Sequence, residues 1–196
     1  MALIAAVPVG LAAVFLDRDG VLNRKAPEGS FVSSWDDFHV LPGVPQAILR
    51  LNRAGLPVIV VSNQRGIALG RYSASQVDSV HQCFQQFLAL SGAHIDAFLV
   101  CPHDAGRCDC RKPLPGLFLQ AAARFPGLTA SQCVMIGDAL VDMEFGRRLG
   151  MTTILVESDL SLQIPGAGQA AELASLRCAS LSDAVDLILG RESSEV

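Results

Sequence analysis

The chain has 196 residues, of which 51% are hydrophobic and 17% are charged, and its formal net charge is −4. A chain of this size and composition can bury a large core without disulfides, which excludes a disordered or coiled-coil protein and predicts one domain over residues 1–196. The negative charge argues against a general nucleic-acid or anionic-membrane surface, although a local cationic pocket can still capture an anionic substrate.

Residues 1–16 are apolar and uncharged, so a signal peptide or a membrane span has to be considered. The segment lacks a basic beginning, contains Pro8 and Gly10, and is shorter than the roughly 20 residues that a spanning helix needs. We therefore expect a cytoplasmic protein. The crowding of Cys101, Cys108 and Cys110 in one segment predicts metal ligation, and the other cysteines are expected to be buried thiols.

Short apolar runs alternate with helical patterns along the chain. Strands are expected at residues 11–16, 58–61, 97–100, 133–136 and 153–156. Helices are expected at residues 45–53, from a cap at Ser75 to just before Gly92, at 116–125, 140–149 and 182–189, and residues 158–179 are expected to form loop and short helix. This alternation predicts an α/β fold with a central parallel sheet, whose ligands lie beyond the carboxyl ends of the strands.

Two carboxylates, Asp17 and Asp19, follow the first apolar run. Extended geometry sends alternate side chains to the same side, so the two can share a hard divalent cation such as magnesium, which would hold them beside a phosphate. One carboxylate can then attack phosphorus, and the other can protonate the leaving oxygen and later deprotonate water. A solvated loop or a helix cap is the alternative interpretation of an isolated pair of this kind.

Three further residues complete the parts of a phosphoryl-transfer site. Ser62 offers a hydroxyl to phosphate oxygens, Lys112 offers a positive charge, and Asp138 offers another magnesium ligand. Each alone has an ordinary explanation as a turn residue or a surface charge. Their joint occurrence after Asp17 and Asp19 is far more specific.

A second group of residues is typical of a structural metal site. Cys101, His103, Cys108 and Cys110 form two pairs with one residue between the members of each pair, and together they can supply the three sulfurs and one nitrogen of a tetrahedral zinc site. The alternative is a set of free thiols beside a surface histidine. Because Lys112 follows the last cysteine so closely, the zinc loop at residues 101–110 would also aim the phosphate-binding lysine.

The chain resembles the haloacid dehalogenase-like superfamily of aspartate-nucleophile phosphatases. The matching segments are Phe15-Leu16-Asp17-Arg18-Asp19-Gly20-Val21-Leu22-Asn23, Val60-Val61-Ser62-Asn63-Gln64, Arg111-Lys112-Pro113, and Ile136-Gly137-Asp138 with Asp142. The resemblance implies a Rossmann-like three-layer sandwich in which Asp17 is the nucleophile and a magnesium ligand. It further implies that Asp19 is the acid/base and binds magnesium through its backbone carbonyl, that Ser62 and Lys112 stabilise the phosphoryl group, and that Asp138 completes the magnesium ligands. Asp142 is expected to lie behind these ligands.

The Cys-Pro-His and Cys-x-Cys-Arg-Lys-Pro segments resemble the branch of this superfamily that contains heptose bisphosphate phosphatases and histidinol-phosphate phosphatases. The motif spacing leaves little room for a separate cap domain. Specificity is then expected from nearby loops, with substrate-binding residues Lys25, Glu28, Asn63, Gln64, Arg65 and Arg111. These basic loops favour a sugar bisphosphate, and Arg111 matches the branch's substrate-recognition arginine. Leu69 and Ala139 depart from the branch, which more often has arginine and lysine there.

Two alternative functions stay open at this point. The first keeps the chemistry and changes the substrate to histidinol phosphate or another small phosphomonoester. The second is a zinc-stabilised binding module without catalysis, against which the intact Asp17, Asp19, Lys112 and Asp138 argue. The expected partner is a small phosphorylated metabolite, with no nucleic acid and no membrane, and the expected assembly is a monomer.

Overall fold

A parallel sheet forms the centre of the molecule. The computed structural model describes residues 7–8, 10–27, 29–157 and 165–190. Six strands pair in these residues: β1 (Ala13–Leu16), β2 (Val58–Asn63), β3 (Ala97–Cys101), β4 (Cys133–Gly137), β5 (Thr152–Val156) and β6 (Leu176–Cys178). Their order across the sheet is β3-β2-β1-β4-β5-β6, and every neighbouring pair is parallel. The predicted α/β fold with a central parallel sheet is confirmed.

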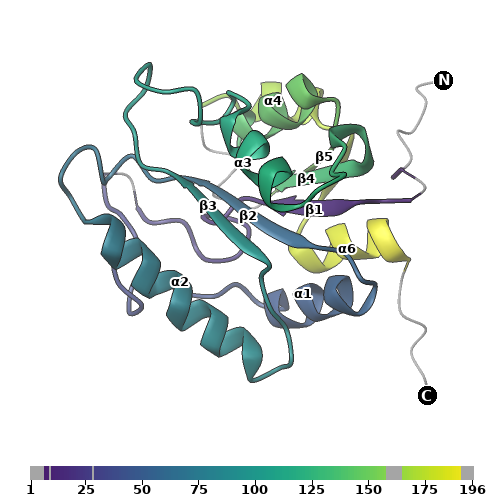
Figure 1. Ribbon diagram of the computed structural model, residues 1–196, viewed down its shortest axis with the longest axis horizontal. Helices are drawn as coiled ribbons and strands as arrows, with labels where there is room; N and C mark the ends of the chain where they lie inside the picture. Colours follow the sequence, from purple (N-terminus) through teal and green to yellow (C-terminus); the bar gives the residue numbers. More distant parts are fainter. Residues whose placement is uncertain (1–6, 9, 28, 158–164, 191–196) are drawn as a thin grey trace.

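Helices cover both faces of this sheet and make three layers (Figure 1). On one face lie α1 (Val44–Arg53), α2 (Ala74–Ala89) and α6 (Leu181–Leu189), and on the other lie α3 (Gly116–Arg124) and α4 (Leu140–Leu149). A short 3₁₀-helix, η1 (Ala130–Gln132), precedes β4, and α5 (Ala167–Leu173) packs beside α4. Within the described ranges, no helix combines the length and the apolar character that crossing a membrane requires.

Strand β1 shows why the apolar runs of this sequence become buried strands. Val14 and Leu16 belong to the core beneath α1, α2 and α6, while Ala13 and Phe15 belong to the core beneath α3 and α4. All four side chains are completely buried. Because side chains alternate across a strand, a strand covered on both faces needs an uninterrupted apolar sequence, and the first polar residue then falls at the sheet's edge.

The strand order places a topological switch point at β1. The chain moves from β1 to β2 and β3 on one side, and it then returns to build β4 and β5 on the other side of β1. Such switch points open a crevice at the carboxyl ends of the strands. The connections that follow β2 and β3 extend from this edge, at the left of Figure 1, and the described residues include no inserted cap domain.

Two local predictions were wrong. Helix α2 is capped by Ser73 instead of Ser75. Ser73 has an extended backbone, its Oγ accepts a hydrogen bond from the Gln76 backbone N–H, and its own backbone N–H donates to Gln76 Oε1, which completes a capping box. Residues 176–178 form an edge strand paired with β5, although loop and short helix were expected. Three residues are too few to show a strand period in the sequence. Residues 158–164 of that prediction lie outside the described part of the chain.

Candidate active site

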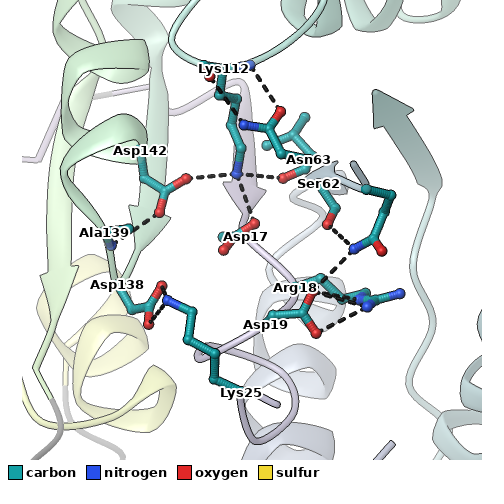
Figure 2. Close-up of polar contacts among 12 residues, drawn as sticks. Asp17, Arg18, Asp19, Lys25, Ser62, Asn63, Lys112, Asp138, Ala139 and Asp142 are labelled. Atoms are coloured by element: carbon teal, nitrogen blue, oxygen red, sulfur yellow. Dashed lines mark hydrogen bonds and ion pairs between the residues drawn. The ribbon is translucent and has the colours of Figure 1, made fainter. Parts of the chain in front are cut away.

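A buried lysine joins two carboxylates at the switch point. Lys112 Nζ lies 2.7 Å from Asp17 Oδ1 and 2.6 Å from Asp142 Oδ1, and it donates a third hydrogen bond to the Val61 carbonyl at 2.8 Å (Figure 2). Only 1% of the Lys112 side chain is exposed. Burial alone would lower the pKa of Lys112, but the charges of Asp142 and Asp17 raise it well above its usual value. The lysine is therefore a fixed cation beside Asp17.

Negative charge still accumulates around this lysine. Asp17, Asp138 and Asp142 each bring a carboxylate oxygen to within 4.8 Å of the others. Burial, with the charge of Asp142, raises the pKa of Asp17 to about 7 despite the opposing effect of Lys112. Burial likewise raises the pKa of Asp138 to about 6. Clustered, buried carboxylate oxygens are the ligands that a hard cation such as magnesium prefers, so these residues fit that ion.

Lys25 already neutralises one of these carboxylates. Its Nζ lies 2.8 Å from Oδ2 and 3.1 Å from Oδ1 of Asp138, which comes from the end of β4 (Figure 2). The sequence predicted Lys25 as a substrate-binding residue, and the structure brings its ammonium group to the predicted magnesium ligand. Residue 20, in the turn beside Asp138, is a glycine with a positive φ, and a Cβ there would lie 2.1 Å from Asp138 Oδ2.

The Asp19 carboxylate is surrounded by donors. Arg18 donates from Nε at 3.1 Å and from Nη2 at 2.9 and 3.0 Å, Asn23 donates at 2.9 Å, and Gln64 Nε2 donates at 3.0 Å. Burial would raise the pKa of Asp19, but the Arg18 charge and these hydrogen bonds lower it below its usual value. Arg18 is itself buried, with its guanidinium carbon 5.8 Å from the centre of the Phe38 ring. These donors favour the ionised form of Asp19 in the substrate-free chain.

Three residues at and just beyond the end of β2 make polar contacts within the site. Asn63 accepts a hydrogen bond from the Lys112 backbone N–H and donates to the Lys112 carbonyl, both at 3.0 Å, so its amide holds the backbone of that lysine. Gln64 Nε2 donates to Ser62 Oγ at 2.8 Å. Because Ser62 Oγ accepts this bond, its own hydrogen remains available to an oxygen of a bound ligand.

The predicted metal cluster is assembled at the end of β3. Cys101 Sγ lies 3.6 Å from Cys108 Sγ and 3.8 Å from His103 Nδ1, which lies 3.3 Å from Cys110 Sγ. A tetrahedral zinc ion with ligand bonds of about 2.0–2.3 Å requires edges of roughly 3.3–3.8 Å. The four residues therefore fit zinc, and the cluster can hold a metal ion.

A pocket of about 310 Å³ opens over Asp17, Asp19 and Lys112. Apart from Asp138 and Glu28, its lining includes every predicted catalytic and substrate-binding residue: Asp17, Asp19, Lys25, Ser62, Asn63, Gln64, Arg65, Arg111 and Lys112. Arg65 pairs with Asp104 from the zinc loop, with Nε 2.5 Å from Oδ1. Within the described chain, Arg111 Nη1 is buried and has no hydrogen-bond partner. Glu28 lies outside the described residues.

Sequence reasoning missed three residues of this site. Arg18 and Asn23 hold Asp19, and Tyr72 donates to Gln64 Oε1 at 2.5 Å. Arg18 stands between the two aspartates, where an arginine usually indicates a solvated loop, and only its burial reveals its contacts. Tyr72 follows a glycine-containing turn with no periodic pattern, so its sequence position carried no signal.

Comparison with known proteins agrees with this geometry. Residues 12–150 match the family described as haloacid dehalogenase-like hydrolase. The D-glycero-alpha-D-manno-heptose-1,7-bisphosphate 7-phosphatase of Mycobacterium tuberculosis is 39% identical over 155 residues, which cover 79% of this chain and 80% of that protein. The D-glycero-beta-D-manno-heptose-1,7-bisphosphate 7-phosphatase of Bordetella bronchiseptica is 37% identical over 147 residues, covering 74% and 80%.

A solved structure is also similar. The D,D-heptose 1,7-bisphosphate phosphatase from B. bronchiseptica, complexed with magnesium and phosphate, superimposes with a TM-score of 0.82 at 32% identity, covering 91% of this chain and 98% of that one. The family match spans more than half of the chain, and the structural match covers 91% of it. The chain therefore belongs to the haloacid dehalogenase-like hydrolase family.

Proposed function

We propose that this chain is a magnesium-dependent phosphatase that removes the 7-phosphate of D-glycero-D-manno-heptose 1,7-bisphosphate through an aspartyl-phosphate on Asp17. The observation that carries the proposal is the convergence of four segments at the switch point, with the buried Lys112 ammonium 2.7 Å from Asp17. The substrate named for the M. tuberculosis and B. bronchiseptica relatives supports the choice among phosphate monoesters.

In the first step, an Asp17 oxygen attacks phosphorus, and the bond from phosphorus to the sugar oxygen breaks. Asp19, which must carry a proton when the substrate is bound, gives that proton to the departing oxygen, so the sugar leaves as a neutral alcohol. The positive charge of Lys112 and the Ser62 hydroxyl stabilise the charge on the phosphoryl oxygens, because both groups line the pocket beside Asp17. Asp142 keeps Lys112 in place at 2.6 Å.

In the second step, water attacks the phosphorus of the aspartyl-phosphate. Asp19, now a carboxylate, takes a proton from this water, and the bond from phosphorus to the Asp17 oxygen breaks. Inorganic phosphate leaves and both aspartates return to their starting states. The four donors around Asp19 suit this step, since they favour its ionised form between the two proton transfers.

Two metal ions complete the proposal. Asp17, Asp138 and the Asp19 backbone carbonyl would hold magnesium, which when bound neutralises charge between the carboxylates and the phosphate. Cys101, His103, Cys108 and Cys110 would hold a structural zinc ion that fixes the segment leading into Lys112.

The pocket's cations support a bisphosphate. Arg111 contributes a buried donor that has no partner within the described residues, and Arg65 stands at the pocket's outer edge. A second phosphate dianion would satisfy the Arg111 donor, whereas the cationic groups of histidinol phosphate would meet like charge there. The relatives carry both alpha and beta anomers in their names, so either anomer of the heptose is a candidate.

Replacing the proposed nucleophile tests the reaction. Asp17→Asn keeps the shape of the side chain and leaves Lys112 paired with Asp142, so we expect folded protein with at least about a 10³-fold lower kcat. Phosphate release is the measurement, with circular dichroism to check the fold. Turnover close to that of the wild-type chain would remove Asp17 from the nucleophile role.

A substrate panel tests the specificity. We expect kcat/KM for at least one anomer of the heptose bisphosphate to exceed that for histidinol phosphate by about 100-fold or more, because histidinol phosphate would bring cationic groups to Arg111 in place of a second phosphate. Faster hydrolysis of histidinol phosphate would overturn the substrate and leave the chemistry in place. No magnesium-dependent phosphate release from any monoester would favour the binding-module alternative.

A further inference from the structure

A chain of hydrogen bonds runs from Tyr72 to the proposed acid/base. The Tyr72 hydroxyl lies 2.5 Å from Gln64 Oε1, and Gln64 Nε2 lies 3.0 Å from Asp19 Oδ2 and 2.8 Å from Ser62 Oγ. Gln64 and Tyr72 are both buried, with 3% and 6% of their surface exposed. Both polar ends of the Gln64 amide are therefore satisfied inside the protein.

The direction of each bond in this chain is fixed by chemistry. Asp19 Oδ2 already accepts hydrogen bonds from Arg18 Nε and Nη2, so the edge of Gln64 that faces this oxygen is the NH₂ group. The opposite edge is then the carbonyl, which can only accept, and the Tyr72 hydroxyl must donate to it. Burial raises the pKa of Tyr72, which keeps this hydroxyl protonated. Tyr72 thus supports the one orientation of Gln64 that suits Asp19.

Gln64 makes a contact that the other donors to Asp19 do not make. Arg18 and Asn23 belong to the same loop as Asp19, so they fix its carboxylate relative to its own backbone. Within the described residues, Gln64, which directly follows β2, is the donor that reaches this carboxylate from another segment of the chain, and the same nitrogen donates to Ser62. Gln64 therefore fixes the position of the Asp19 carboxylate relative to the Ser62 hydroxyl, which is proposed to bind the phosphoryl group.

The position of Tyr72 is built into the fold. A Cβ on Gly66 would lie 2.1 Å from Tyr72 Cε1, so the ring occupies the space left open by that glycine. The ring also meets Phe31 edge-on, with centroids 5.6 Å apart. These ring contacts remain in a phenylalanine, so Tyr72→Phe removes the hydroxyl and little else.

We propose that Tyr72 is a positioning residue that acts through Gln64 to hold Asp19 where it serves the departing oxygen. The proposal rests on the function proposed above, in which Asp19 is the acid/base. Without the hydroxyl, Gln64 Oε1 is buried without a donor, and the amide must turn or shift to find one. Asp19 then loses its link to β2, and its useful orientation becomes less populated.

Leaving groups of different basicity provide the test. An alkyl phosphate, such as a sugar phosphate that the wild-type chain hydrolyses, releases a basic alkoxide that needs a proton, whereas p-nitrophenyl phosphate releases a stable phenolate. We expect Tyr72→Phe to lower kcat/KM about tenfold for the alkyl phosphate and less than about threefold for p-nitrophenyl phosphate. Equal losses for both substrates, or no loss, would overturn the proposal.

Ser73→Ala is the matched control. It removes a hydroxyl from the next residue, where Ser73 caps α2 without touching the Gln64 chain. We expect it to lower the melting temperature while kcat/KM for both substrates stays within about twofold of the wild-type value. A control with the same dependence on the leaving group would mean that Tyr72→Phe acts through general loosening of this segment, which overturns the proposal.

Crystal structures of the variants test the chain of hydrogen bonds independently of turnover. In Tyr72→Phe we expect the Gln64 amide to have moved out of bonding distance of Asp19 or Ser62, whereas in Asp17→Asn the chain of bonds stays intact. An unmoved Gln64 in Tyr72→Phe would overturn the positioning role even for an active enzyme. Turnover by Asp17→Asn would instead contradict the proposed function, so the two failures can be told apart.

Discussion

At the scale of single residues, Lys25 is the side chain whose observed contact differs most from its expected one. Its ammonium lies against Asp138, one of the carboxylates proposed to bind magnesium. A cation at that carboxylate offsets the cost of burying it, and a metal ion has to displace this cation before it can bind. We therefore expect Lys25 to compete with magnesium for the Asp138 carboxylate.

Removing this ammonium group gives a direct prediction. We expect Lys25→Met to tighten magnesium binding about tenfold, measured by isothermal titration calorimetry, and to lower the melting temperature of the metal-free protein, because Asp138 loses its counter-ion. Arg24→Met is the control, since it changes the net charge equally and, in the described part of the chain, Lys25 and not Arg24 pairs with Asp138. Unchanged magnesium affinity in Lys25→Met would contradict the competition.

At the scale of elements, the zinc loop and the end of β2 meet at Lys112. The cluster precedes Lys112 by two residues, and Asn63 holds the lysine's backbone through two hydrogen bonds of 3.0 Å. The lysine is thus supported from two directions. We expect that loss of a bound metal ion would unfold the zinc loop while Asn63 still holds Lys112 in the active site.

Cys108→Ser tests this division. We expect zinc content to fall from about one ion per chain toward zero, and the melting temperature to fall by about 5 °C or more, because a structural metal contributes to folding. Metal analysis and thermal unfolding provide the measurements. Cys83→Ser, a half-buried thiol outside the cluster, should keep its zinc. Full zinc content in Cys108→Ser would contradict the ligand assignment.

At the scale of the whole molecule, stability depends on pH through the clustered carboxylates. Without magnesium, burial raises the pKa of Asp17 to about 7 and that of Asp138 to about 6, from 3.8 in an unfolded chain. Between these values the folded state binds more protons than the unfolded state. The contribution of these groups to stability therefore falls as pH rises from about 4 to about 7.

Magnesium should reverse this trend, because it favours the ionised carboxylates. We expect the increase in melting temperature on adding magnesium to be small near pH 5 and to grow toward about pH 8, measured by thermal unfolding with and without the ion. Asp17→Asn removes one of the two titrating groups and should flatten this dependence. A magnesium effect that stays constant across this range would contradict the assignment of these carboxylates to the ion.

The parallel strands and the edge of the sheet that carries the site follow from short-range patterns. Uninterrupted apolar runs ending at Asp17, Ser62 and Asp138 predict buried parallel strands, and parallel strands bring their carboxyl ends together. The contacts among the side chains do not follow in this way. Lys25 and Asp138 are 113 residues apart in sequence, and nothing in either local pattern specifies their pairing.

The misassigned cap of α2 has a similar origin. Ser73 and Ser75 are equally good capping residues, and the return of the Gln76 side chain to Ser73 decides between them. A glutamine stands three residues after Ser73 but not after Ser75, and this capping-box spacing predicts Ser73 as the cap. Strand β6 is different, because its three residues acquire their conformation only from pairing with β5.

The grip of Asn63 on Lys112 has one more consequence, for how this protein tolerates change in length. Because the lysine is anchored from the neighbouring strand, we expect that residues between His103 and Cys108 can be added or deleted without moving the Lys112 ammonium away from Asp17.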